Sequence, residues 1–155
     1  MSRVAGVVLA AGTSSRFGSG NKLLASYCGQ PMLRCVVETA LATELEPVII
    51  VTGHDAGGVQ QALDGLDVVF AHNAGFETGQ ASSLKAGIAA VPDGCAGAMI
   101  LLGDMPDVSA EVINLLMDEF AGEACIVVPH HGGVRGNPVI LGRGSFAELS
   151  ETAGD

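Results

Sequence analysis

The stretch that constrains this chain most is residues 4 to 24, which read V-A-G-V-V-L-A-A-G-T-S-S-R-F-G-S-G-N-K-L-L. It begins with an apolar run of strand length, which closes at Gly12 and continues into a loop of small residues that contains Arg16 and Lys22. Small side chains let backbone N–H groups approach an anion closely, and the cations supply the positive charge that a polyphosphate requires. The stretch therefore predicts a strand followed by a phosphate-binding loop.

Two better-known loops that bind phosphates after a strand are excluded. The Walker loop needs a Gly-Lys pair followed by Ser or Thr, and the chain contains no Gly-Lys pair. The dinucleotide-binding fingerprint needs a third glycine where this chain has Leu23, after Gly18 and Gly20. The loop is thus a phosphate-binding loop of another kind, and a turn carrying two solvated cations is the competing interpretation.

Along the rest of the chain, apolar runs of strand length alternate with helical patterns. The predicted strands are 48–51, 68–71, 99–102, 126–128 and 139–141, and apolar residues at helical spacing occupy 32–41, 59–63, 84–91 and 112–120. Asp55 and Ser109 are predicted to cap two of these helices. The alternation predicts an α/β fold in three Rossmann-like layers around a mainly parallel sheet. Ligands of such sheets bind outside the carboxyl ends of the strands.

Composition excludes several classes of protein. The formal charge of −10 argues against a nucleic-acid-binding surface, and 48% hydrophobic residues argue against disorder. No apolar run reaches the about 18 residues that a membrane span requires, and the N-terminus lacks the pattern of a signal peptide, so we expect a cytoplasmic protein without membrane contact. The four cysteines form no C-x-x-C pair, which favours reduced thiols over a zinc site.

Asp104 follows an apolar strand directly, within the segment Gly103-Asp104-Met105-Pro106. A hard cation such as Mg²⁺ takes oxygen ligands and is commonly held by one or two carboxylates together with substrate phosphates. Aspartate is also common in turns after strands. From this residue alone, a metal ligand and a turn residue are equally good interpretations.

Uncharged polar groups follow two other predicted strands. Thr52 and Gly53 lie at the end of strand 48–51, and the segment after strand 68–71 leads into a helix. That segment contains short donors and acceptors suited to a base or a ribose, namely Asn73, Thr78, Gly79, Gln80, Ser82 and Ser83. We therefore expect a nucleotide at this edge of the sheet.

Four segments of the chain resemble one known family. They are L-A-A-G-T-S-S-R-F-G-x-x-N-K-L-L at 9–24, N-x-x-F…G-x-x-S-S-L at 73–84, L-G-D-M-P at 102–106 and R-G-N-P-V at 135–139. Together they resemble the nucleotidyltransferases that condense a nucleoside triphosphate with a phosphorylated acceptor, most closely the molybdenum cofactor cytidylyltransferase group within the molybdopterin-guanine dinucleotide synthase-like family. Ala74 stands where that family usually has proline. The resemblance covers essentially the whole chain.

The resemblance implies a nucleotide-diphospho-sugar transferase-like fold and a reaction of CTP with the phosphate of molybdopterin, the Mo cofactor, dependent on Mg²⁺. It implies catalytic roles for Arg16, Lys22 and Asp104, contact of the acceptor with Asn137, and metal binding by Asp104 and Asp155. The expected nucleotide-binding residues are Leu9, Ala10, Ala11, Gly12, Thr52, Gly53, Gln80, Ser82 and Ser83. It also allows a transient contact with a molybdenum hydroxylase or its maturation chaperone.

The choice of base rests on one position of the resemblance. The segment Leu9-Ala10-Ala11-Gly12 resembles the cytidine-using branch, since guanosine-using relatives tend to have a second glycine in place of Ala11. Alternatives are a GTP-dependent molybdopterin enzyme, an enzyme that takes a sugar-phosphate or isoprenoid-precursor acceptor, and a non-catalytic factor of molybdenum cofactor maturation. In the resembled family more chain follows the late Gly-Asp pair. We therefore expect residues 1–155 to be a single nucleotidyltransferase domain that lacks its C-terminal segment.

Overall fold

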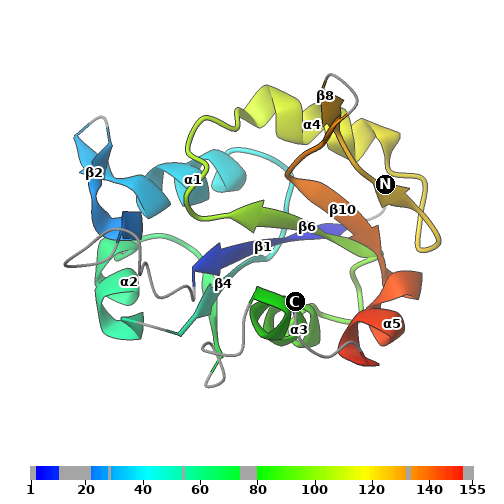
Figure 1. Cartoon of the computed structure of the whole chain (residues 1–155), viewed down its shortest axis with the longest axis horizontal. Helices are drawn as coiled ribbons and strands as arrows, with labels where there is room; N and C mark the ends of the chain where they lie inside the picture. Colours follow the sequence, from blue (N-terminus) through cyan, green and yellow to red (C-terminus); the bar gives the residue numbers. More distant parts are fainter. Residues whose placement is uncertain are drawn as a thin grey trace.

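The computed structural model of the protein describes residues 3–10, 22–27, 29–53, 55–73, 80–131 and 134–151. A six-stranded sheet runs through its middle, in the order β5-β4-β1-β6-β10-β7 (Figure 1). The strands are β1 (Val4–Ala10), β4 (Val48–Thr52), β5 (Val69–His72), β6 (Gly97–Leu102), β7 (Ile126–Val127) and β10 (Val139–Gly142). The first four of the order are parallel, whereas β10 is antiparallel to both β6 and β7. The mainly parallel sheet predicted from the sequence is therefore confirmed.

Helices cover both faces of this sheet (Figure 1). One face packs against α1 (Met32–Leu41), α2 (Ala56–Ala62) and α4 (Ala110–Glu119), and the other against α3 (Gln80–Ala89) and α5 (Phe146–Glu151). In β1, Val4 and Val8 face the first group of helices and Ala5 and Val7 face the second. Successive residues of a strand point to opposite faces, so β1 must be apolar throughout to bury both. The result is the predicted arrangement of three layers.

The two predicted helix caps have different outcomes. The hydroxyl of Ser109 accepts a hydrogen bond from the Val112 N–H at 3.2 Å, so this cap is confirmed. The prediction for Asp55 is wrong: Asp55 occupies the N-cap position of α2, but its side chain accepts no capping hydrogen bond. Its backbone is left-handed, with φ 58° and ψ 43°, whereas a capping side chain goes with an extended backbone. Asp55 instead places its carboxylate against the backbone of Gly58.

Several short elements were not predicted from the sequence. Two hairpins pair β2 (Ser26–Tyr27) with β3 (Gln30–Pro31), and β8 (His130–His131) with β9 (Val134–Arg135). The 3₁₀ turns η1 (Lys22–Leu24) and η3 (Arg143–Ser145) are equally short. Two or three residues are too few to show a period. No helix in the described part of the chain combines the length and the apolarity needed to cross a membrane.

Gly87 sets the distance between α3 and the sheet. A Cβ atom at this position would lie 2.4 Å from Val7 Cγ1 and 3.0 Å from Val51 Cγ2. Both valines belong to the fully buried core between β1, β4 and α3. The helix can therefore lie this close only because Gly87 has no side chain.

We expect Gly87→Ala to lower the free energy of unfolding by about 1–3 kcal/mol, the usual cost of overpacking a core. The matched control is Gly57→Ala in α2, where a Cβ would meet nothing within 4 Å. That change should be neutral or stabilise by up to about 1 kcal/mol through helix propensity. Urea unfolding of both variants checks the pair, and equal midpoints would contradict the packing argument.

Candidate functional site

The parallel register brings the ends of four strands to one edge of the sheet. Ala10 at the end of β1 pairs with Thr52 of β4, which pairs in turn with His72 of β5. On the other side of β1, Leu9 pairs with Leu102, the last residue of β6. The chain leaves these strands at the same level, so the segments that follow them share one edge. This is the carboxyl edge, where ligands of open α/β sheets bind.

Asn137 belongs to the same edge although its strand runs in the opposite direction. Val139, the first residue of β10, lies opposite Ile100 of β6. Because the pair is antiparallel, the residues before Val139 extend toward the carboxyl end of β6. Asn137, two residues before Val139, is exposed. The predicted acceptor-binding residue is thus placed near the predicted metal-binding segment.

The turn after β6 holds Asp104 at this edge. Its first residue, Gly103, is buried and donates its N–H to the Leu9 carbonyl at 3.1 Å, and the Met105 N–H closes the turn on Leu102 O at 3.1 Å. A Cβ on Gly103 would lie 3.0 Å from both Leu9 O and Leu33 Cδ1. Asp104 itself is exposed. The tight fit of Gly103 therefore fixes the backbone from which the Asp104 carboxylate projects.

Other residues predicted at the end of β1 lie in part outside the described residues. Leu9 is half-buried, Ala10 is buried, and Lys22 is the first residue of η1. Ala11, Gly12 and Arg16 lie outside the described residues, as does Asp155, so their predicted roles stay predictions. The η1 turn packs near the Asp104 turn, since a Cβ on Gly103 would lie 3.3 Å from Leu23 Cδ2.

Thr52 is covered by His72. The Thr52 side chain is 1% exposed, and its Oγ1 lies 3.2 Å from Nδ1 of His72, whose side chain is exposed. A ligand at this edge would therefore meet His72 before it met the Thr52 hydroxyl. Sequence reasoning assigned His72 no role, although its position at the end of a predicted parallel strand was a signal that could have found it. Gly53, which follows Thr52, is buried.

Asn73 anchors the start of α3. Its Nδ2 donates to Ser82 Oγ at 3.0 Å and to Ser83 Oγ at 3.1 Å, and its own N–H donates to Thr52 O at 2.6 Å. Asn73 and Ser83 are both buried. Among the predicted nucleotide-binding residues, Ser82 and Ser83 are therefore brought together by a shared amide. Gln80 begins α3, and its side chain lies outside the described residues.

The donor set of the edge suits a cation that substrate phosphates help to hold. Within the described ranges, His, Cys, Asp and Glu side chains form no group of three or more that could hold a metal ion. An exposed carboxylate supplies the hard oxygen donor that Mg²⁺ or Mn²⁺ prefers. Asp104 therefore fits a metal shared between protein and triphosphate better than an all-protein metal cage.

The opposite, amino edge of the sheet carries a separate hollow of about 480 Å³. It is lined by Arg3, Val4, Glu44, Glu46, Met117, Asp118 and Phe120. Nearby, burial raises the pKa of the Cys95 thiol, an effect that Arg3 and Arg143 oppose. The described cysteines Cys35, Cys95 and Cys125 are free thiols, and Cys95 is buried.

The chain belongs to the family of MobA-like NTP transferase domains, whose model matches residues 6–155. Among curated proteins it is 33% identical over 118 residues to "Bifunctional protein GlmU" of Brevibacillus brevis, across 76% of this chain and 25% of that protein. The chain thus spans about a quarter of the length of such curated relatives.

Solved structures share the fold. Rv0371c from Mycobacterium tuberculosis is 32% identical with a TM-score of 0.83, covering 99% of this chain and 78% of that chain. It has also been solved as a complex with manganese, at a TM-score of 0.80, 30% identity and the same coverage. A nucleotidyl transferase from Methanothermobacter thermautotroptrophicus is 25% identical with a TM-score of 0.87, covering 99% and 78%. The predicted nucleotide-diphospho-sugar transferase-like fold is confirmed.

The Asn73 anchor generates a prediction about stability. We expect Asn73→Ala to lower the free energy of unfolding by about 1–3 kcal/mol, because it leaves the buried Ser83 hydroxyl without this donor. Ser82→Ala should cost less, since the Ser82 side chain is only half-buried and Asn73 keeps its bond to Ser83. Thermal or urea unfolding ranks the two variants, and a larger loss for Ser82→Ala would contradict the anchor.

Proposed function

We propose that this protein is a CTP:molybdopterin cytidylyltransferase. It transfers CMP from CTP to the phosphate of molybdopterin, which gives the cytosine dinucleotide of the cofactor and pyrophosphate. The acceptor phosphate attacks the α-phosphorus, and the bond from that phosphorus to the bridging oxygen of the departing pyrophosphate breaks.

One observation carries this proposal: the segment that begins at Lys22 packs beside the turn that presents Asp104, at the carboxyl edge of β1 and β6. Asp104 lies on this side of the edge, and Lys22 is the first residue of the adjoining η1 segment. Other polar side chains, including Thr52, His72 and Asn73, lie on the β4 and β5 side. A nucleoside triphosphate has the same polarity, so we place its phosphates over β1 and β6 and its nucleoside over β4 and β5.

Positioning and neutralisation of charge are the main work of the chain in this reaction, as in phosphoryl transfer generally. Lys22 and Arg16 hold the triphosphate and stabilise the charge that develops on the leaving pyrophosphate. Asp104, with Asp155 as a second carboxylate, would hold Mg²⁺, which neutralises phosphate oxygens when bound. Asn137 contacts the acceptor from the neighbouring β10 side.

The proposed choice of base and acceptor rests on the resemblance of the first loop to the cytidylyltransferase group, in which Ala11 favours cytidine over guanosine. Relatives named GlmU keep another acceptor class open as the alternative. A panel of CTP, GTP, UTP and ATP, assayed with the full chain, Mg²⁺ and molybdopterin or a sugar phosphate, separates these cases. Pyrophosphate release that is fastest with CTP and dependent on molybdopterin is the expected result.

A non-catalytic maturation factor is the rival from another class. Such a protein would bind molybdopterin and deliver it to a molybdenum hydroxylase without releasing pyrophosphate from any nucleotide. Equilibrium binding of molybdopterin with no pyrophosphate across the panel would support that rival.

We expect Asp104→Asn to leave the fold intact and to lower kcat strongly while binding of CTP changes less. The amide keeps the size of the side chain but loses the charge that holds the cation, whose effect is greatest on charge developing in the transition state. Asp118→Asn, an exposed carboxylate at the end of α4, is the control and should behave as wild type. Unchanged Mg²⁺-dependent turnover in a folded Asp104→Asn variant would remove Asp104 from the site.

We expect Lys22→Ala to lower the rate with CTP by about 10²-fold or more, the order observed when one preorganised electrostatic group is lost. Arg16→Lys keeps the charge but loses the guanidinium fork and should be impaired less. Arg3→Ala, at the opposite edge of the sheet, serves as the control for loss of a cation. Pyrophosphate release under saturating CTP measures all three, and full activity of Lys22→Ala would exclude the phosphate-loop interpretation.

A further inference from the structure

The segment that begins at Lys22 and the turn that presents Asp104 both lie outside the sheet. Lys22 opens η1, and Asp104 comes two residues after the end of β6. The Gly103 N–H bond to Leu9 O holds the Asp104 turn against β1. Lys22 belongs to η1, which is not a strand, so strand register does not fix the separation of the two segments. Something else must hold them at the spacing that a triphosphate and its cation require.

One direct contact between the segments is packing. The η1 residue Leu23 is buried, and its Cδ2 lies so close to Gly103 that a Cβ there would be 3.3 Å away. Packing of this kind fixes distance, but a smooth apolar contact resists sliding poorly. A directional contact would add what the packing lacks.

The directional contact is a hydrogen bond from the Tyr27 hydroxyl to Oδ1 of Asp107. Tyr27 lies in β2, three residues after the end of η1, and Asp107 lies three residues after Asp104 in the loop between β6 and α4. The bond therefore joins the continuation of the phosphate-loop segment to the continuation of the metal-binding turn. It is made on the surface, where no need to bury a polar group accounts for it.

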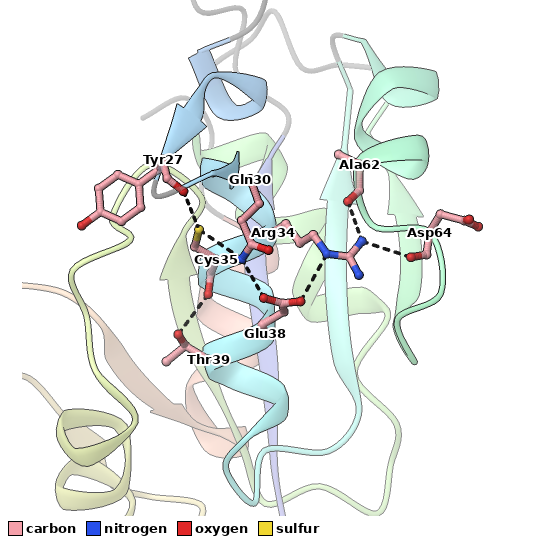
Figure 2. A network of polar contacts seen from close by, with 8 residues as sticks. All are labelled: Tyr27, Gln30, Arg34, Cys35, Glu38, Thr39, Ala62 and Asp64. Carbon is pink, nitrogen blue, oxygen red and sulfur yellow. Dashed lines mark hydrogen bonds and ion pairs between the residues drawn. The ribbon is translucent and has the colours of Figure 1, made fainter.

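The Tyr27 end of this bond is held by a network on α1 (Figure 2). Cys35 Sγ donates to the Tyr27 carbonyl at 3.5 Å, and Gln30 Nε2 donates to Cys35 Sγ at 3.4 Å and to Glu38 Oε1 at 2.7 Å. In addition, the Met32 N–H donates to Ala25 O at 2.9 Å. The Tyr27 ring points away from this network (Figure 2). The hairpin β2–β3 is thus fastened to the helix, and the hydroxyl is presented from a fixed base.

The network continues from α1 to α2. Arg34 Nε bonds Glu38 Oε2 at 3.2 Å, and Arg34 NH1 donates to the carbonyls of Ala62 and Asp64, each at 3.1 Å (Figure 2). This branch leads away from the Asp104 turn. It offers a matched control, because its loss loosens the same helix without touching the bond to Asp107.

We propose that Tyr27 and Asp107 are positioning residues that clamp the Asp104 turn to the Lys22 segment, and so set the spacing between the two charges that act on the triphosphate. The inference rests on the proposed function. Neither residue touches substrate. Their effect is exerted through the backbone of the two segments, so it should alter turnover and the requirement for the cation rather than affinity for the nucleotide.

The test compares variants of the full chain in pyrophosphate release from CTP, with Mg²⁺ titrated. Tyr27→Phe removes one hydroxyl only. It should lower kcat by about 10-fold or more, because a misplacement of about 1 Å in a catalytic site can cost about 10²-fold in rate, and it should raise the Mg²⁺ concentration that gives half the maximal rate. KM for CTP should stay close to the wild-type value. Asp107→Ala should behave as Tyr27→Phe does.

Two further variants separate positioning from general stability. Asp107→Asn keeps an acceptor oxygen and should recover part of the lost rate, and the double variant Tyr27→Phe/Asp107→Ala should be no worse than either single change. Arg34→Met should lower the unfolding midpoint but leave kcat per folded molecule unchanged. Rates are therefore normalised to the folded fraction measured for each variant.

The outcomes for the clamp and for the proposed function are distinguishable. If wild type releases pyrophosphate from CTP and Tyr27→Phe matches it in kcat and in Mg²⁺ dependence, the clamp is wrong and the proposed function stands. The clamp is also overturned if the loss in Tyr27→Phe is additive with that in Asp107→Ala, or vanishes on normalisation. If wild type releases no pyrophosphate from any nucleotide, the proposed function fails first and the clamp with it.

Discussion

The pairing of β1 with β4 on one side and β6 on the other is the interaction on which the rest of this structure depends. The apolar side chains of β1 point to both faces of the sheet, so their burial requires helices on each face. The same pairing brings the carboxyl ends of the strands to one level, which gathers the loops that follow them at one edge. Core and candidate site are therefore consequences of one set of backbone hydrogen bonds.

Two glycines let neighbouring segments pack closely against β1. Gly87 lets α3 lie against Val7 of β1, and Gly103 lets the turn after β6 lie against Leu9. A methyl group at Gly87 would collide with Val7, and one at Gly103 would lie 3.0 Å from Leu9 O, which is a tight contact. The exposed Asp104 is thus carried by a backbone that the core itself holds in place, which is what a preorganised electrostatic site requires.

The two halves of the carboxyl edge differ in the residues that they carry. In a protein of formal charge −10, cations are few, and Lys22 lies in the segment that packs beside the Asp104 turn. The other half of the edge carries polar side chains that partly hydrogen-bond one another: Thr52 with His72, and Asn73 with the two serines in the first turn of α3. Under the proposed function, these internal bonds hold the wall of the nucleoside site rather than contact the base directly.

The sequence by itself determined the order of strands and helices, the mainly parallel sheet and the positions of Thr52, Asn73 and Asp104 at strand ends, because apolar periodicity and turn residues are local signals. It failed for Asp55, where the left-handed backbone depends on neighbours, and it could not show that the Thr52 hydroxyl is covered by His72. Only the tertiary structure decided such pairings, together with that of Tyr27 and Asp107. Those two residues are 80 positions apart, and no local pattern encodes a contact that exists only once β1 and β6 have paired.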